Sequence, residues 1–129
     1  MSAQEVIKAR LTSFAGLSAL IATRVHPGVA PQNTPRPYVT YSVVSEFRQY
    51  GMGGGIGLVT ARYQFDVFAD AAPAARAVID QLRLALDFWS SPASSPAIVE
   101  VTVENVIDGY EPDTGLFHPL IDFQVIHRE

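Results

Sequence analysis

The sequence contains no cysteine among its 129 residues. This absence excludes a disulfide framework, a zinc-thiolate site, an iron-sulfur cluster and a thiol nucleophile. No apolar run reaches the roughly 18 residues that a membrane-spanning helix needs. The first five residues also lack the basic stretch that opens a signal peptide. We therefore expect a soluble protein that stays in the cytoplasm where it is made, with no membrane contact.

Charge is scarce as well, and basic residues are the scarcer kind. Lys and Arg number 9 against 13 Asp and Glu, which gives a formal net charge of -4. Because nucleic-acid affinity depends on cationic contacts to phosphates, duplex DNA is disfavoured as the primary ligand. Charged residues make up 17% of the chain, below the roughly 25% of an average soluble domain. This shortage favours a subunit that buries part of its surface against copies of itself or other partners.

What is present suffices for one domain, residues 1–129, with its own hydrophobic core. Apolar residues recur every three or four positions over residues 3–15, which predicts an amphipathic helix. Ser2 and Glu5 match a capping box at its start, and Gly16 is expected to end it. A second apolar turn follows at residues 17–21. The prolines of residues 26–37 disfavour helix and central strand, so we expect an ordered loop there.

The pattern then changes to a period of two. Residues 38–43 and residues 63–67 alternate apolar and polar side chains, which predicts two strands with one buried face each. The glycine-rich segment 51–57 lies between them. We therefore predict a long hairpin whose loop, residues 47–58, has a mobile tip.

A strongly amphipathic helix is predicted over residues 71–89, with Asp70 as its cap and Pro73 in its first turn. Its buried stripe comprises Ala75, Val78, Ile79, Leu82 and Leu86. The opposite face carries charges of alternating sign, as expected of a solvated surface: Arg76, Asp80, Arg83 and Asp87. Trp89, at the end of the helix, is interpreted as a packing residue.

Two more alternating runs, residues 98–106 and 120–126, predict a second strand pair joined by residues 109–115. In the first run we expect Val99, Val101 and Val103 to face inward. The element order is thus helix, strand, strand, helix, strand, strand. It predicts an α+β fold in which a four-stranded, mainly antiparallel sheet carries helices packed on one face.

The glycine-rich segment does not match a phosphate-binding motif. A P-loop needs Lys and Ser or Thr after its last glycine, but Gly57 is followed by Leu58 and Val59. A dinucleotide fingerprint opening at Gly51 would need a glycine where the chain has Ile56. Both motifs also require a helix next, whereas a strand is predicted here. The segment is better suited to docking against a partner, and we assign no cofactor.

Candidate catalytic residues are few and isolated. None of His26, His118 and His127 belongs to a metal-binding helix motif, and Ser18 lacks the turn of a nucleophile elbow. Asp66 and Asp122 fall on the outward face of predicted strands and could pair as acid and base, but a solvated sheet face predicts the same residues. We therefore assign no catalytic and no metal-binding residue.

Two segments of the sequence, taken with the order of its elements, resemble a known protein family. Residues 24–41 contain Arg-Val-His-Pro, then Pro-Gln, then Pro-Arg-Pro-Tyr-Val-Thr-Tyr, and residues 62–69 read Arg-Tyr-Gln-Phe-Asp-Val-Phe-Ala. Together with the element order, this resembles the tail-completion proteins of long-tailed bacteriophages and gene-transfer particles. They are also called tail terminators or tail-to-head joining proteins.

The resemblance implies a structural virion protein without catalysis. Such a protein would form a hexameric ring of its own copies that ends the tail tube at its head-proximal end and meets the head connector, or stopper, protein. DNA would only pass through the lumen, and assembly would take place in the host cytoplasm. The proposed interface residues lie in the hairpin loop: Arg48, Tyr50, Met52, Ile56 and Leu58.

Two alternatives remain open from the sequence. One is a small ligand-binding or enzymatic domain that uses the Gly-rich loop together with His118. The other is a regulatory, inhibitor-like binding module that acts as a stable monomer on a host target.

Overall fold

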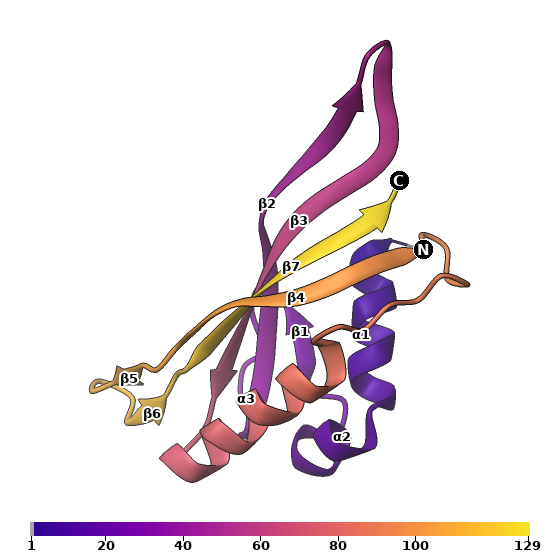
Figure 1. The fold of residues 1–129 in the computed structure, drawn as a ribbon. Helices are drawn as coiled ribbons and strands as arrows, with labels where there is room; N and C mark the ends of the chain where they lie inside the picture. Colours follow the sequence, from indigo (N-terminus) through magenta and orange to yellow (C-terminus); the bar gives the residue numbers. More distant parts are fainter. Residues whose placement is uncertain (1) are drawn as a thin grey trace.

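A computed structural model describes residues 2–129, apart from the side chain of Ile56 (Figure 1). The chain begins with two helices, α1 (Ala3–Ser13) and α2 (Ala15–Ile21). The predicted cap at Ser2 is confirmed, because its hydroxyl accepts a hydrogen bond from the backbone N–H of Glu5 at 3.3 Å. No helix of the described residues is long and apolar enough to cross a membrane.

The break between α1 and α2 is two residues earlier than the predicted end at Gly16. Phe14 has an extended backbone and serves as the C-cap of α1 and the N-cap of α2. Gly16 lies inside α2, so the prediction that it ends the first helix is wrong. The half-buried ring of Phe14 packs against the core, and the bend there lets α2 bury Leu17 and Ile21.

The sheet has five strands rather than the predicted four, and its spatial order is β1-β2-β3-β7-β4. Its members are β1 (Val25–Pro27), β2 (Tyr38–Gly51), β3 (Gly54–Phe68), β4 (Ile98–Ile107) and β7 (Leu120–Arg128). A separate two-stranded sheet forms from β5 (Tyr110–Glu111), within the predicted connection 109–115, and β6 (Leu116–Phe117), directly after it.

The additional strand, β1, starts the segment that was predicted to be a loop. It pairs in parallel with β2, and Pro27 stands opposite Tyr41. Proline can occupy this position because β1 is an edge strand, where a missing N–H costs no ladder bond. The Tyr41 carbonyl instead accepts a hydrogen bond from Gly28 at 2.8 Å. The other pairings of the main sheet are antiparallel.

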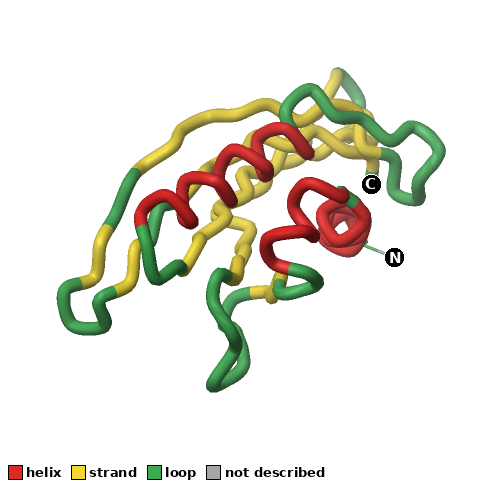
Figure 2. Tube along the Cα trace, turned by 90° about the horizontal axis from the view of Figure 1, so that it is seen from below, coloured by secondary structure: helices red, strands yellow, loops and turns green. Residues whose placement is uncertain are grey.

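The helices lie on one face of the curved sheet, as predicted (Figure 2). The third helix, α3 (Ala72–Leu86), buries the whole predicted stripe, and Pro73 lies in its first turn. Asp70 is not its cap: the cap residue is Ala71, which has no side-chain hydrogen bond. Asp70 instead accepts a hydrogen bond from Arg36 at 2.7 Å, which ties the proline-rich loop to the start of α3.

In β4, two β-bulges change which side chains face the core. The pairing with β7 shifts between Ile98 and Glu100 and again between Val103 and Asn105. Each bulge inserts one residue, so the alternation of inward and outward side chains changes phase. Val99 is consequently exposed, which contradicts the predicted inward position, while Val101 is fully buried as expected.

Candidate interface on the long hairpin

The β2–β3 hairpin is the longest protrusion of the molecule (Figure 1). Its two strands pair from Tyr38 opposite Phe68 to Gly51 opposite Gly54. On one side, β1 covers β2 no further than Tyr41, and on the other, β7 covers β3 from Leu58 onward. Beyond both points the hairpin continues as a two-stranded extension, whose outer backbone groups have no neighbouring strand among residues 2–129.

The segment predicted as a loop, residues 47–58, is therefore mostly strand. Met52 and Gly53 form the turn between β2 and β3. Gly53 and Gly54 have φ angles of +100° and +135°. Residues that carry a Cβ atom rarely adopt such angles, so the backbone geometry requires glycine here. The glycine-rich pattern thus specifies a tight hairpin end and not a long flexible connection.

The tip of this hairpin presents apolar side chains to solvent. Phe47 is 61% exposed, Tyr50 is 72% exposed, and Met52 is fully exposed. Leu58 is half-buried where β3 meets the end of β7. Single exposed apolar residues are common, but a group of them on a protruding arm is typical of an interaction surface. The sequence-based set omitted Phe47, although it belongs to the same run as Tyr50.

Arg48 is engaged within the chain. Its guanidinium donates a hydrogen bond to the carboxylate of Glu129, the last residue, and this contact raises the pKa of Arg48. The backbone N–H of Glu129 also donates to the carbonyl of Gly57 at 3.1 Å. These bonds attach the C-terminus to the hairpin just below its tip. Among the predicted interface residues, Tyr50 and Met52 lie on the two-stranded extension and Arg48 lies at its base, opposite Val59. The side chain of Ile56 lies outside the described structure.

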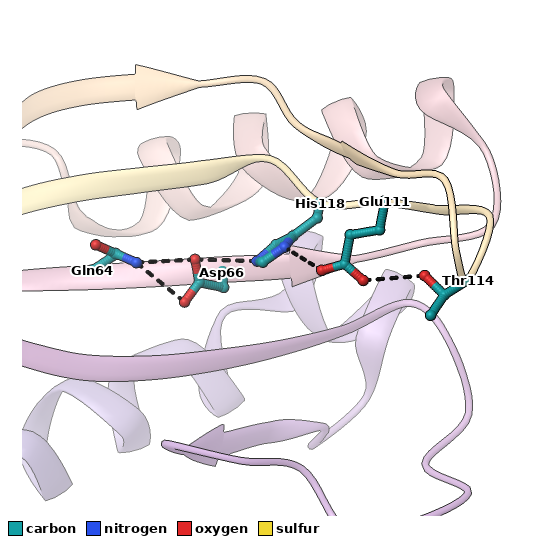
Figure 3. Close-up of polar contacts among 5 residues, drawn as sticks. All are labelled: Gln64, Asp66, Glu111, Thr114 and His118. Atoms are coloured by element: carbon teal, nitrogen blue, oxygen red, sulfur yellow. Dashed lines mark hydrogen bonds and ion pairs between the residues drawn. The ribbon is translucent and has the colours of Figure 1, made fainter.

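A second polar arrangement lies on the sheet face away from the helices (Figure 3). The ring of His118 stands between two carboxylates, with Nε2 3.3 Å from Asp66 and Nδ1 2.9 Å from Glu111. Thr114 donates to Glu111 at 3.1 Å and Gln64 donates to Asp66 at 3.2 Å. The chain of contacts joins the β5–β6 sheet to β3.

The Gly-rich segment and His118 cannot form one site. The glycines lie at the start of β3, whereas His118 contacts Asp66 near its end. Twelve residues separate Gly54 from Asp66, and a strand rises about 3.3 Å per residue, so the separation is of the order of 40 Å. The alternative of a ligand site built from both elements loses its geometric basis.

The other candidate residues are engaged in structural contacts. His127 is buried, and its Nδ1 lies 2.8 Å from the carbonyl of Arg128. Asp122 is not a solvated surface residue as predicted: it is buried and accepts a hydrogen bond from Arg62 at 2.7 Å. Within residues 2–129, no three His, Cys, Asp or Glu side chains gather in a way that could hold a metal ion.

A groove lies at the opposite end of the molecule from the hairpin tip, between the start of α3 and the β5–β6 sheet. Its volume is about 540 Å³, and its lining includes Ala75, Tyr110, Phe117 and Pro119. The sequence offered no signal for this groove, because its walls come from segments more than thirty residues apart.

The family model described as "Tail completion protein gp17" matches residues 5–128, nearly the whole chain. The chain belongs to this family of tail completion proteins. It is accordingly a structural protein of the virion, associated with other tail or head proteins. A search of curated proteins found no match.

A solved structure described as "Virion of native gene transfer agent (GTA) particle" contains a chain with the same fold as this tail completion protein. The two share 18% sequence identity with a TM-score of 0.82. The similarity covers 99% of this chain and 96% of the other. At this level of identity, the comparison supports the architecture: three helices on one face of a mainly antiparallel sheet.

Proposed function

We propose that this tail completion protein forms a hexameric ring that ends the phage tail tube and joins it to the head connector. The whole chain acts as one domain, without catalysis or a cofactor. The observation that carries the proposal is the exposure of apolar side chains on the hairpin: Tyr50 and Met52 lie where the described residues provide no neighbouring strand on either side, and Phe47 lies on the open edge of β2 just below. The hexameric copy number follows from the family resemblance.

The tip supports assembly for two physical reasons. Burial of exposed apolar surface contributes about 25 cal/mol per Å² to association. The open outer edge of β2 beyond Tyr41 offers backbone groups that another chain can pair with. When such a contact joins two different surfaces of identical subunits, it closes into a ring if the rotation per subunit is right.

The partners in this proposal are neighbouring copies, the tail tube protein and the head connector protein. The interface set consists of Arg48, Tyr50, Met52, Ile56 and Leu58, now extended by Phe47. DNA passes through the lumen without being bound. The net charge of -4 supports this part of the proposal, because an acidic subunit does not attract phosphates.

A double variant, Tyr50→Ser with Met52→Ser, tests the proposed function. Both side chains are exposed, so the free energy of unfolding should change by less than about 0.5 kcal/mol. Ring formation should be lost or reduced at least tenfold, as measured by native mass spectrometry of the protein alone and mixed with tails that lack it. Complementation of those tails should fall in parallel.

Val29→Ser is the matched control, because Val29 is 84% exposed on a different loop. This variant should assemble normally. A double variant that forms rings and completes tails as well as the unaltered protein would contradict the proposal.

A further inference from the structure

We infer that the groove between α3 and the β5–β6 sheet receives the hairpin tip of a neighbouring copy. This inference rests on the proposed function, since it identifies the second of the two surfaces that a ring of identical subunits requires. The groove is assigned neither by the family model nor by any sequence motif.

The walls of the groove are fixed to the rest of the fold. Phe117 bridges to Ala69, with reciprocal backbone hydrogen bonds of 2.9 and 3.0 Å. Behind it, the contacts of His118 with Asp66 and Glu111 hold the β5–β6 sheet against β3. A preformed groove binds without first being ordered, which lowers the entropic cost of docking.

The chemistry of the groove suits an uncharged, apolar occupant. The aromatic rings of Tyr110 and Phe117 lie 4.9 Å apart, and Tyr110 is 54% exposed. The two charged residues of the lining, Arg76 and Asp108, face each other at 3.9 Å, so they leave no net charge. An occupant with a net charge would lose hydration here without gaining a partner of opposite charge.

The hairpin tip is uncharged and carries apolar side chains, as an occupant of this groove should. Residues 50–57 read Tyr-Gly-Met-Gly-Gly-Gly-Ile-Gly and contain no charged side chain. The tip and the groove are therefore matched in charge, since each is electrically neutral. The thioether of Met52 favours contact with aromatic rings such as those of Tyr110 and Phe117. The glycines around it allow the backbone to approach the walls closely.

The distance between the tip and the groove requires that the occupant come from another copy. The hairpin tip lies at the opposite end of the molecule from β5, β6 and the start of α3 (Figure 1), the elements whose residues line the groove. Gly54 and Phe68 bound β3, and fourteen steps at about 3.3 Å place these ends of the order of 45 Å apart. A subunit cannot therefore fill its own groove. A tip at one end and a groove at the other give a head-to-tail contact that every copy repeats.

Because the chain has no cysteine, single-cysteine variants test the contact directly. Gly55→Cys keeps Tyr50 and Met52, and its added Cβ meets only the Tyr50 ring at 3.9 Å, an ordinary contact. Ala72→Cys places the partner thiol on the groove, at the exposed start of α3. One variant carries a mass tag, and the two are mixed, oxidised and separated without reductant.

Tagged–untagged dimers are expected as the main product of this mixture, and the double variant should give a ladder that ends at the ring. Leu84→Cys replaces Ala72→Cys in the control, because Leu84 is exposed on the same helix but twelve residues away. That mixture should give at least tenfold less of the mixed dimer. Each mixture is tested alone and with tails that lack the protein.

The outcomes separate the two proposals. If native mass spectrometry shows rings but no disulfide forms between positions 55 and 72, the groove assignment is overturned and the ring proposal stands. The same holds if position 55 cross-links more strongly to position 84 than to position 72. Absence of any oligomer, alone or on tails, would overturn both. Ring loss in Ala72→Arg, with unchanged folding by circular dichroism, would support the groove independently of cross-linking.

Discussion

At the scale of single residues, the pair formed by Arg62 and Asp122 shows how an outward-facing position can become buried. The side chain of Asp122 is 5% exposed, while that of Arg62 is 49% exposed. One carboxylate oxygen of Asp122 accepts the hydrogen bond from Arg62, and the other has no partner among the described atoms. The guanidinium is therefore the main compensation for a buried negative charge.

Removing that compensation should destabilise the protein. Arg62→Ala is expected to lower the free energy of unfolding clearly more than a control at an exposed ion pair, because the buried carboxylate of Asp122 loses a charge-assisted hydrogen bond. Arg76→Ala is the control: its carboxylate contacts, at 3.6 and 3.9 Å, are solvent-exposed, so its effect should stay below about 0.5 kcal/mol. Urea denaturation measures both. Equal effects would show that Asp122 does not depend on Arg62.

Tyr63 gives the molecule a predicted response to alkaline pH. Burial, with smaller contributions from Glu46 and Tyr41, raises the pKa of Tyr63 above its usual value. The folded state then holds the phenol proton more tightly than the unfolded state, whose pKa is about 10. The stability from this group is fully present below about pH 10 and is lost as the pH rises toward the folded pKa.

Thermal melts between pH 8 and pH 12 test this response. Unfolding temperature should be steady at the lower values and fall above about pH 10. Tyr63→Phe cannot ionise, so the fall should become shallower, although the buried Tyr41, whose pKa is also raised, leaves part of it. An equally steep fall in the variant would contradict the assignment to Tyr63.

At the scale of elements, the β2–β3 hairpin combines two functions along its length. Its lower half belongs to the core, where Phe65 lies against Tyr41, Tyr63 and Phe123 with ring centroids 5.6 to 6.4 Å apart. Its upper half exposes Phe47, Tyr50 and Met52, and beyond Leu58 it leaves the sheet. Stability should therefore depend on the lower half and assembly on the upper half.

Two substitutions of the same residue type test this division. Phe65→Ala should cost about 3 to 5 kcal/mol in the free energy of unfolding, because Phe65 is fully buried and leaves a cavity. Phe47→Ala should cost less than about 0.5 kcal/mol, since its ring is largely in water. Chemical denaturation of both variants gives the comparison. A large loss in Phe47→Ala would place part of the core in the hairpin tip.

The same hairpin shows what local sequence can and cannot reveal about an element. The alternation of Tyr63, Phe65 and Val67 correctly predicted a strand with one buried face. The run of glycines between two alternating segments was interpreted as a loop with a mobile tip, yet Gly54 and Gly55 pair with Gly51 and Tyr50 across the hairpin. Pairing with a partner strand overrode the intrinsic preference of these residues.

At the scale of the whole molecule, the hairpin tip and the groove are separate surfaces that lie far apart. The hairpin tip lies at one end of the sheet (Figure 1). The contacts around His118 (Figure 3) and the groove beside α3 lie toward the other end, near β5 and β6. A small-molecule site gathers its polar groups in one concavity, whereas a ring subunit needs distinct surfaces for its two neighbours. The arrangement is consistent with a tail completion protein, and the proposed head-to-tail contact uses both ends.

The amino-acid sequence by itself determined the α+β class, the buried stripe of α3, the inward residues of β3 and β7, and the family. These properties depend on local periodicity and composition, which a linear pattern records. The tertiary structure alone decided that β1 adds a fifth strand, that β7 lies between β3 and β4, and that bulges expose Val99. It also decided that Asp122 is buried and that α3 and β5–β6 enclose a groove. Each of these depends on contacts between residues distant in the chain, and such contacts form only once the segments pack together.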